Sequence, residues 1–207
     1  MSSDKPAIDF YFDFSSPYGY LAATRIEALA SRHHRRVNWR PILLGPMFKA
    51  AGTAPLLGVP LKGPYSARDL LRTARFLQIP YMQPAEFPIA TQNAARAFYW
   101  MRDRDEAKAR KFAMACYSTY FAHGIDISSP EKVAEIATQF GNDRAAVLSA
   151  IADPVVKDRL KNEVDAALAR GVFGSPYIIV DGEPFWGNDR LDQVDAWLAT
   201  GGFWRMP

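Results

Sequence analysis

Alternating hydrophobic and polar residues near the N-terminus predict a strand that leads directly into a helix. From Ile8 to Phe14, three phenylalanines alternate with Asp and Tyr positions, which is the period of a strand with one buried face. Ser16 and Pro17 then provide residue types favoured at the N-cap and the first position of a helix. We expect this helix to extend to Arg35 and a second strand to cover Val37–Ile42, which completes a βαβ unit.

A second region of strand pattern lies near the C-terminus. The β-branched run at 177–180 is followed by Asp181-Gly182, a pair typical of a two-residue type I′ hairpin, and Glu183 to Trp186 forms the returning strand. A helix over 190–198, ended by Gly201-Gly202, closes the chain. The pattern therefore predicts a ββα unit.

Between these two regions the pattern is helical. Residues 45–66 are rich in Gly and Pro and predict an ordered but irregular loop. Helices are then expected near 67–78, 91–103, 105–122, 130–140, 143–152 and 154–170. Ser129-Pro130 and Asp153-Pro154 are typical helix starts, and Gly141 and Gly171 are typical helix ends.

The start of the first helix resembles the site of thiol-disulfide oxidoreductases with a thioredoxin-like fold, which place Cys-x-x-Cys there. The two cysteine positions are Ser16 and Gly19 in this chain, so a dithiol reaction is excluded. Ser16-Pro17 alone is equally consistent with an ordinary helix start. Thioredoxin-like folds also place a cis-proline before a strand, opposite this helix start, and we expect the bond between Ser175 and Pro176 to be cis.

The predicted fold class is therefore α/β, a thioredoxin-like βαβ…ββα core split by a large all-helical insertion. Residues 1–45 and 171–207 are assigned to the thioredoxin-like domain, and residues 46–170 to the helical insertion domain. With 49% hydrophobic and 13% aromatic residues, the chain has enough apolar surface for a sizeable core.

Charge and cysteine content narrow the possible functions. The net charge of +3 is spread along the chain, and the short basic cluster at 33–36 is interpreted as the end of the first helix, so no nucleic-acid partner is expected. The single cysteine, Cys116, excludes an intramolecular disulfide, and no metal-binding spacing is present. No signal peptide and no run of 18 apolar residues is evident, so we expect no membrane association and a location in the reducing cytoplasm.

Three segments together resemble the 2-hydroxychromene-2-carboxylate isomerases, relatives of the kappa-class glutathione transferases in the DsbA-like branch of the thioredoxin superfamily. These segments are Asp9–Tyr18, Val172–Pro176 and Trp186–Leu191. A weaker match includes Lys62, Tyr65, Asp69 and Leu70. The resemblance covers nearly the whole chain in the order of its elements.

The resemblance implies glutathione as a cofactor, and it implies roles for the matching positions. Ser16 would direct its hydroxyl at the glutathione sulfur, as the catalytic residue. The backbone of Ser175, held by Pro176, would pair with the cysteinyl backbone of the tripeptide. Asn188 and Asp189 would receive its γ-glutamyl end, although both residues also suit a plain helix cap.

One position departs from the pattern of the family. Relatives commonly carry Asn-x-Pro-Pro after the second strand, where this chain has Thr53-Ala54-Pro55-Leu56. Thr53 can form fewer hydrogen bonds than the amide of Asn, which leaves the glycyl-end contact of glutathione open.

The implied reaction is a cis–trans isomerisation of 2-hydroxychromene-2-carboxylate or a similar aromatic carboxylate. Its pocket requires aromatic walls and a cation, for which Tyr18, Phe48 and Tyr81 and the Lys49 ammonium are candidates, although a core or surface role explains each as well. A kappa-like glutathione transferase or peroxidase and a redox-inactive thioredoxin-like binding module remain alternatives. The resemblance also implies a homodimer.

Overall fold

The structure, a computed structural model, describes residues 5–203 and contains one four-stranded sheet in the order β2-β1-β3-β4. Strand β1 (Ile8–Phe12) pairs in parallel with β2 (Val37–Pro41) and antiparallel with β3 (Tyr177–Val180). β3 forms an antiparallel pair with β4 (Glu183–Trp186). Because β1 and β3 are antiparallel, the residues after β1 and the residues before β3 meet at one edge of the sheet.

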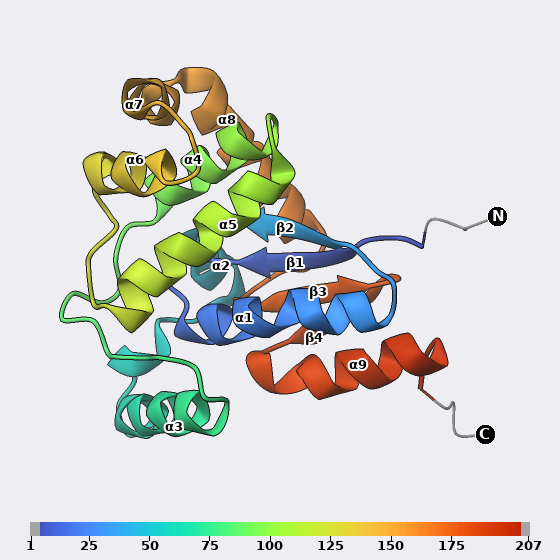
Figure 1. Cartoon of the computed structure of the whole chain (residues 1–207). Helices are drawn as coiled ribbons and strands as arrows, with labels where there is room; N and C mark the ends of the chain where they lie inside the picture. The colour runs from blue at the N-terminus through green and yellow to red at the C-terminus, as the bar shows by residue number, and fades with distance from the viewer. Residues whose placement is uncertain (1–4, 204–207) are drawn as a thin grey trace.

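The helices that come after β1 and after β4 in the chain lie beside the sheet (Figure 1). Helix α1 (Pro17–Arg32) and helix α9 (Leu191–Thr200) lie side by side, and the His33 ring contacts Asp195 at 2.6 Å between them. A short 3₁₀ turn, η3 (Asn188–Arg190), precedes α9. The type I′ hairpin is confirmed, since Asp181 and Gly182 have φ values of 52° and 92°.

The first helix ends three residues earlier than the sequence predicts. After Arg32 the chain turns, and His34 adopts a left-handed φ of 55°. Arg35 then forms a bidentate ion pair with Asp181 at 2.7 and 3.0 Å. The basic residues 33–36 therefore follow the helix, and Arg35 is paired with the hairpin turn.

The inserted region is helical, with the expected boundaries correct to within a few residues for most helices. Its elements are α2 (Leu44–Ala51), η1 (Leu56–Gly58), α3 (Lys62–Phe76), α4 (Gln92–Arg102), α5 (Glu106–Tyr117) with a π turn (Ser118–Ala122), α6 (Pro130–Thr138), α7 (Arg144–Ala152) and α8 (Pro154–Ala169). Figure 1 shows α3 apart from the other inserted helices. The division into two domains stays a prediction.

The expectation of an irregular loop over residues 45–66 is wrong. Helix α2 occupies its first part, and α3 begins at Lys62. Pro46 and Pro64 both fall in the first turn of a helix, where a backbone N–H has no intrahelical acceptor to lose, and Gly52 ends α2 with a left-handed φ of 64°. The Gly and Pro residues thus mark helix ends here.

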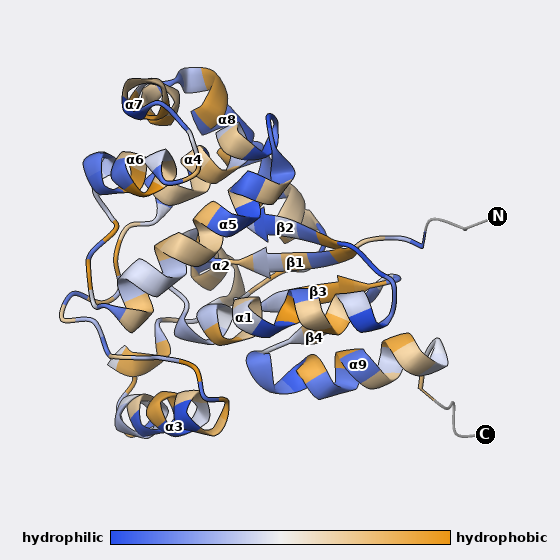
Figure 2. Ribbon diagram, viewed as in Figure 1, coloured by the Kyte–Doolittle hydropathy of each residue, from blue (hydrophilic) through white to orange (hydrophobic). Residues whose placement is uncertain are grey.

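Aromatic residues connect the sheet to the inserted helices. Phe10 and Phe12 of β1 are fully buried, as is Phe14 beyond the end of the strand, and Tyr11 on the other face of β1 is buried as well. The Phe12 ring lies 5.9 Å from Phe98 of α4 and 5.8 Å from Tyr117 of α5. Figure 2 shows hydrophilic and hydrophobic residues mixed along α3, α5 and α9, as in helices with one buried face. Between residues 5 and 203, no helix is long and apolar enough to cross a membrane.

Candidate functional site

The start of α1 and the loop before β3 meet at the edge where β1 ends. Ser16 caps the helix, because its Oγ accepts a hydrogen bond from the Gly19 N–H at 3.0 Å. The same hydroxyl donates to the Ser175 carbonyl at 2.8 Å. The Ser175–Pro176 bond is cis, as expected. The structure therefore brings together Ser16, Ser175 and Pro176, which are far apart in the sequence.

Gly19, at the second cysteine position, has no room for a side chain. A Cβ there would lie 2.6 Å from the Tyr117 hydroxyl and 2.8 Å from the Ser175 hydroxyl. The Tyr117 hydroxyl is buried and donates to the Asp13 carbonyl at 2.8 Å, so it is not free to move aside. The site is thus closed to a second thiol at residue 19 by packing as well as by residue type.

Asp13 is a buried residue of this site that the sequence pattern assigns to the polar face of the first strand. Strand β1 ends at Phe12, so the chain has already turned at Asp13 and the side chain points inward with 3% exposure. Burial raises the pKa of Asp13, and the hydrogen bonds that its carboxylate accepts oppose this rise. The donors are Ser15 N, Leu44 N and Thr91 Oγ1. Its place two residues before the Ser15-Ser16-Pro17 motif is the sequence signal for it.

The turn η3 lies next to α1 and holds the two residues expected at the γ-glutamyl end. Asn188 is 5% exposed, and its side-chain Oδ1 is buried without a hydrogen-bond partner. Asp189 is exposed, with a carboxylate oxygen 3.4 Å from Arg190. The Gly187 N–H donates to the Pro176 carbonyl at 3.0 Å, which ties this turn to the cis-proline loop.

Tyr18 connects the first turn of α1 to α3. Its hydroxyl donates to Asp69 Oδ2 at 2.6 Å. Burial, this hydrogen bond and the nearby charge of Asp189 raise the pKa of Tyr18 well above the ordinary value. Tyr18 is therefore a neutral phenol between α3 and the site.

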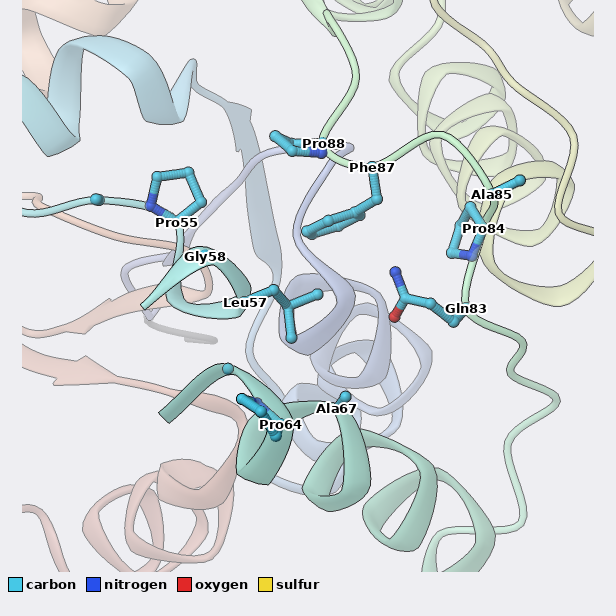
Figure 3. Close-up of a pocket in the computed structure, with 12 residues that line it drawn as sticks. Pro55, Leu57, Gly58, Pro64, Ala67, Gln83, Pro84, Ala85, Phe87 and Pro88 are labelled. Carbon is cyan, nitrogen blue, oxygen red and sulfur yellow. The ribbon is translucent and has the colours of Figure 1, made fainter. Parts of the chain in front are cut away.

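An apolar pocket of about 710 Å³ opens between η1, α3 and the chain at 83–88. Its lining consists of Ala54, Pro55, Leu57, Gly58, Gly63, Pro64, Ala67, Gln83, Pro84, Ala85, Phe87 and Pro88. Figure 3 shows Phe87 across the space from Pro64 and Ala67 of α3, with Leu57 and Gln83 on the two sides between them. No charged side chain belongs to this lining, and Gln83 is its one side chain with an amide.

The pocket lies beside the start of α1. The N–H of Ile89, directly after the cis bond between Phe87 and Pro88, donates to Ser15 Oγ at 3.2 Å. At the other end of this segment, the Tyr20 hydroxyl donates to the Pro80 carbonyl at 2.9 Å. Residues 80–89 are thus bound at one end to α1 and at the other end to the loop directly before it.

Four other expected site residues lie outside the pocket lining. Lys49 is exposed on α2, and Phe48 beside it is half-buried. Tyr81 stacks on Phe121 at 5.9 Å, and burial raises its pKa to about 12. Thr53 is exposed directly before the lining residue Ala54.

Residues 5–203 contain neither a metal site nor an accessible thiol. Their His, Cys, Asp and Glu side chains form no group that would hold a metal ion. Cys116 is fully buried, and burial raises the pKa of its thiol well above the ordinary value, in keeping with the role of a small core residue.

The fold and this site define a thioredoxin-fold protein of the DsbA type in which Ser and Gly occupy the thiol positions. The family model of the DSBA-like thioredoxin domain matches residues 7–199. A 2-hydroxychromene-2-carboxylate isomerase of Sphingobium xenophagum is 34% identical over 92% of this chain and 97% of its own length. The solved structure of a 2-hydroxychromene-2-carboxylate isomerase, 29% identical, superposes with a TM-score of 0.84 and covers 93% of this chain and 94% of the other.

Kappa-class enzymes are also similar. The human glutathione S-transferase kappa 1 is 27% identical over 89% of this chain and 87% of its own length. The chain belongs to the 2-hydroxychromene-2-carboxylate isomerase family of DsbA-like thioredoxin domains.

Proposed function

We propose that this protein is a glutathione-dependent cis–trans isomerase that acts on 2-hydroxychromene-2-carboxylate or a similar intermediate of aromatic catabolism. The isomerase class rests on the curated relatives of that name and on the matching solved structure. The observation that carries the glutathione assignment is the contact of the Ser16 hydroxyl with both the first turn of α1 and the Ser175 backbone.

The residues around this contact fit the chemical groups of glutathione. The buried Oδ1 of Asn188 accepts no hydrogen bond, and buried polar atoms without a hydrogen-bond partner are rare in proteins. The γ-glutamyl ammonium of glutathione would supply that donor, with the exposed Asp189 carboxylate beside it to balance the charge. The Ser175 backbone would pair with the cysteinyl residue as a neighbouring strand does.

Ser16 would change its hydrogen bond when the cofactor binds. Its hydroxyl donates to the Ser175 carbonyl in this structure. A cysteinyl N–H that pairs with this carbonyl would free the hydroxyl to donate to the sulfur. The N-terminus of α1 adds free N–H groups and a partial positive charge.

These two effects favour the thiolate. A cysteine thiol has a pKa of about 8.5, so only a few per cent is ionised near neutral pH. A hydrogen bond to a charged group contributes about 1.5–3 kcal/mol, and one pKa unit corresponds to about 1.4 kcal/mol, so Ser16 would lower the thiol pKa by about one to two units. When bound, glutathione supplies a thiolate that adds reversibly to the conjugated double bond of the substrate and thereby permits rotation.

The pocket between η1, α3 and residues 83–88 is the proposed site of the substrate ring. Its prolines, Leu57 and Phe87 present an apolar surface, and it opens beside Ser15 and α1. Because no cation belongs to the lining, the proposed contacts of the substrate carboxylate are two residues outside it, the exposed Lys49 of α2 and the Tyr18 phenol. Thr53, at the edge of the lining, is the proposed contact of the glycyl end.

Titration calorimetry with glutathione, followed by an isomerisation assay, tests this function. We expect wild-type protein to bind glutathione and to isomerise 2-hydroxychromene-2-carboxylate only in its presence, with both properties weakened in Asn188→Ala. An assay of conjugation to chlorodinitrobenzene tests the kappa-like alternative, which is favoured by the similarity to kappa-class transferases. A protein that binds no glutathione would instead be a redox-inactive binding module.

The cytoplasmic location and the homodimer belong to this proposal as well. A reducing compartment would supply glutathione and suits a chain whose single cysteine is buried. The dimer rests on the family resemblance, and light scattering after size-exclusion chromatography measures it.

A further inference from the structure

Three helices begin around one buried carboxylate. Asp13 precedes the N-cap of α1, and its Oδ1 accepts the Ser15 N–H at 2.7 Å. Its Oδ2 accepts the N–H of Leu44, the first residue of α2, at 2.7 Å. Thr91, the N-cap residue of α4, donates its hydroxyl to Asp13 Oδ1 at 2.9 Å and makes no side-chain cap of its own helix.

Each of these helices is connected to a different part of the proposed site. Helix α2 ends at Gly52, where the Thr53 N–H bonds to the Phe48 carbonyl at 2.9 Å, and the chain passes directly into the pocket wall at 54–58. The other wall, at 83–88, continues through Ile89, whose N–H donates to Ser15 Oγ, into Thr91. Helix α1 carries Ser16.

We propose that Asp13 and Ser15 are positioning residues that fix both walls of the apolar pocket relative to Ser16. This inference rests on the proposed function and adds which residues align the substrate ring with the reacting sulfur. Asp13 and Ser15 are 3% and 6% exposed, and their bonds connect the strand–helix loop to residue 44 at the start of α2 and to residues 89 and 91 of the inserted segment. An alignment error of about 1 Å costs up to about 100-fold in rate, so such fixed links affect turnover.

Removal of single hydrogen-bond donors to Asp13 tests the positioning role more mildly than removal of its buried carboxylate. Thr91→Val replaces the hydroxyl that binds Asp13 with a methyl group of similar size. Thr24→Val is its control, because the Thr24 hydroxyl donates within α1 to the Leu21 carbonyl. Leu44→Pro removes the N–H donor at a first helical position, where proline is accepted, and the extended Leu43 (φ −115°, ψ 120°) suits a residue before proline. Leu44→Ala is the control, since it loses the side chain and keeps the N–H.

The measurements separate pocket alignment from cofactor binding. We expect Thr91→Val, and Leu44→Pro relative to Leu44→Ala, to lower kcat/KM for the chromene carboxylate about fivefold or more, the factor that one hydrogen bond represents, while the glutathione Kd stays within about twofold. Ser15→Ala is expected to act in the same direction. Binding of anilinonaphthalene sulfonate, a fluorescent apolar probe, is expected to weaken in parallel.

Two results would overturn the inference. Folded Thr91→Val and Leu44→Pro proteins with the kcat/KM and probe affinity of their controls would show that the links do not set the pocket. An equal loss of glutathione affinity would show that Asp13 supports the scaffold as a whole. A wild-type protein without isomerase activity would refute the proposed function, yet the probe affinities would still test the positioning role.

Discussion

At the scale of single residues, the site depends on small side chains in fixed places. The Ser16 hydroxyl accepts one hydrogen bond and donates another, so it is held at the helix start before any ligand arrives. Gly19 leaves the space that the Tyr117 and Ser175 hydroxyls fill. The sequence motifs identify Ser16 and Ser175, but no local pattern indicates that the Tyr117 hydroxyl lies beside Gly19.

Ser16→Ala is expected to lower glutathione-dependent turnover by tenfold or more, because it removes a hydrogen bond worth about 1.5–3 kcal/mol to the thiolate. Ser129→Ala is the matched control for the loss of a helix cap, because Ser129 caps α6 in the same way. We expect the loss of activity to come from the missing hydrogen bond to the thiolate and not from a loss of folding. Steady-state kinetics and thermal unfolding of both variants check this. Activity in Ser16→Ala close to that of Ser129→Ala would refute the role of Ser16.

Gly19→Ala is expected to reduce stability by about 1–3 kcal/mol, since overpacking of a buried site has this cost and outweighs the higher helix propensity of Ala. The new methyl group would press on the Tyr117 and Ser175 hydroxyls. Gly45→Ala in α2, where a Cβ meets nothing within 4 Å, is expected to be neutral or stabilising. Urea unfolding measures both, and equal effects in the two variants would contradict the packing argument.

At the scale of elements, ion pairs connect the strands to the helices around them. Asp9 of β1 accepts hydrogen bonds from Arg40 of β2 at 2.8 Å and from Arg170, at the end of α8, at 2.6 Å. Burial tends to raise the pKa of Asp9, but the two guanidinium groups outweigh burial and hold that pKa below its ordinary value. The paired, ionised form therefore stabilises the fold.

The sign of the resulting pH dependence follows from this lowered pKa. The contribution of Asp9 is complete above the pKa of an unfolded Asp, near 3.8, and is lost as the pH falls through the lower pKa of the folded state. Asp9→Asn is expected to cost about 1.5–3 kcal/mol at pH 7, the range for hydrogen bonds to charged groups, and less with increasing acidity. Urea unfolding at pH 7 and at decreasing pH measures the difference.

The control for this series is Asp165→Asn, which breaks the exposed pair with Lys161. It is expected to change stability by less than about 1 kcal/mol at any pH, as exposed pairs do. A constant deficit of Asp9→Asn at all pH values would assign its effect to packing.

At the scale of the whole molecule, the inserted helices and the sheet share one aromatic core, and ligand binding is expected to stabilise both. Glutathione at about 100 times its Kd adds about 2.7 kcal/mol by mass action, which corresponds to roughly 5–10 °C in Tm for a chain of this size. Differential scanning calorimetry with glutathione, and with cysteinylglycine as the control without a γ-glutamyl group, checks this. No shift with glutathione would exclude it as the cofactor.

Much of the architecture was determined by the sequence alone, because it depends on local physics. Period-two hydrophobicity marked β1, Ser-Pro and Asp-Pro pairs marked helix starts, and Asp181-Gly182 marked a hairpin. The family resemblance added the site motifs, and the comparisons confirm that family. The same local signals misled at 45–66, where Gly and Pro are both loop residues and helix-end residues.

Only the tertiary structure decided how the site is held and where its pocket lies. The three donors to Asp13 come from residues 2, 31 and 78 positions along the chain, and no local pattern joins them. The unpaired Asn188 oxygen and the uncharged pocket lining also depend on which segments fold against each other. The physical reason is that local preference sets each helix start, whereas burial and hydrogen bonding between distant segments set what those helix starts surround.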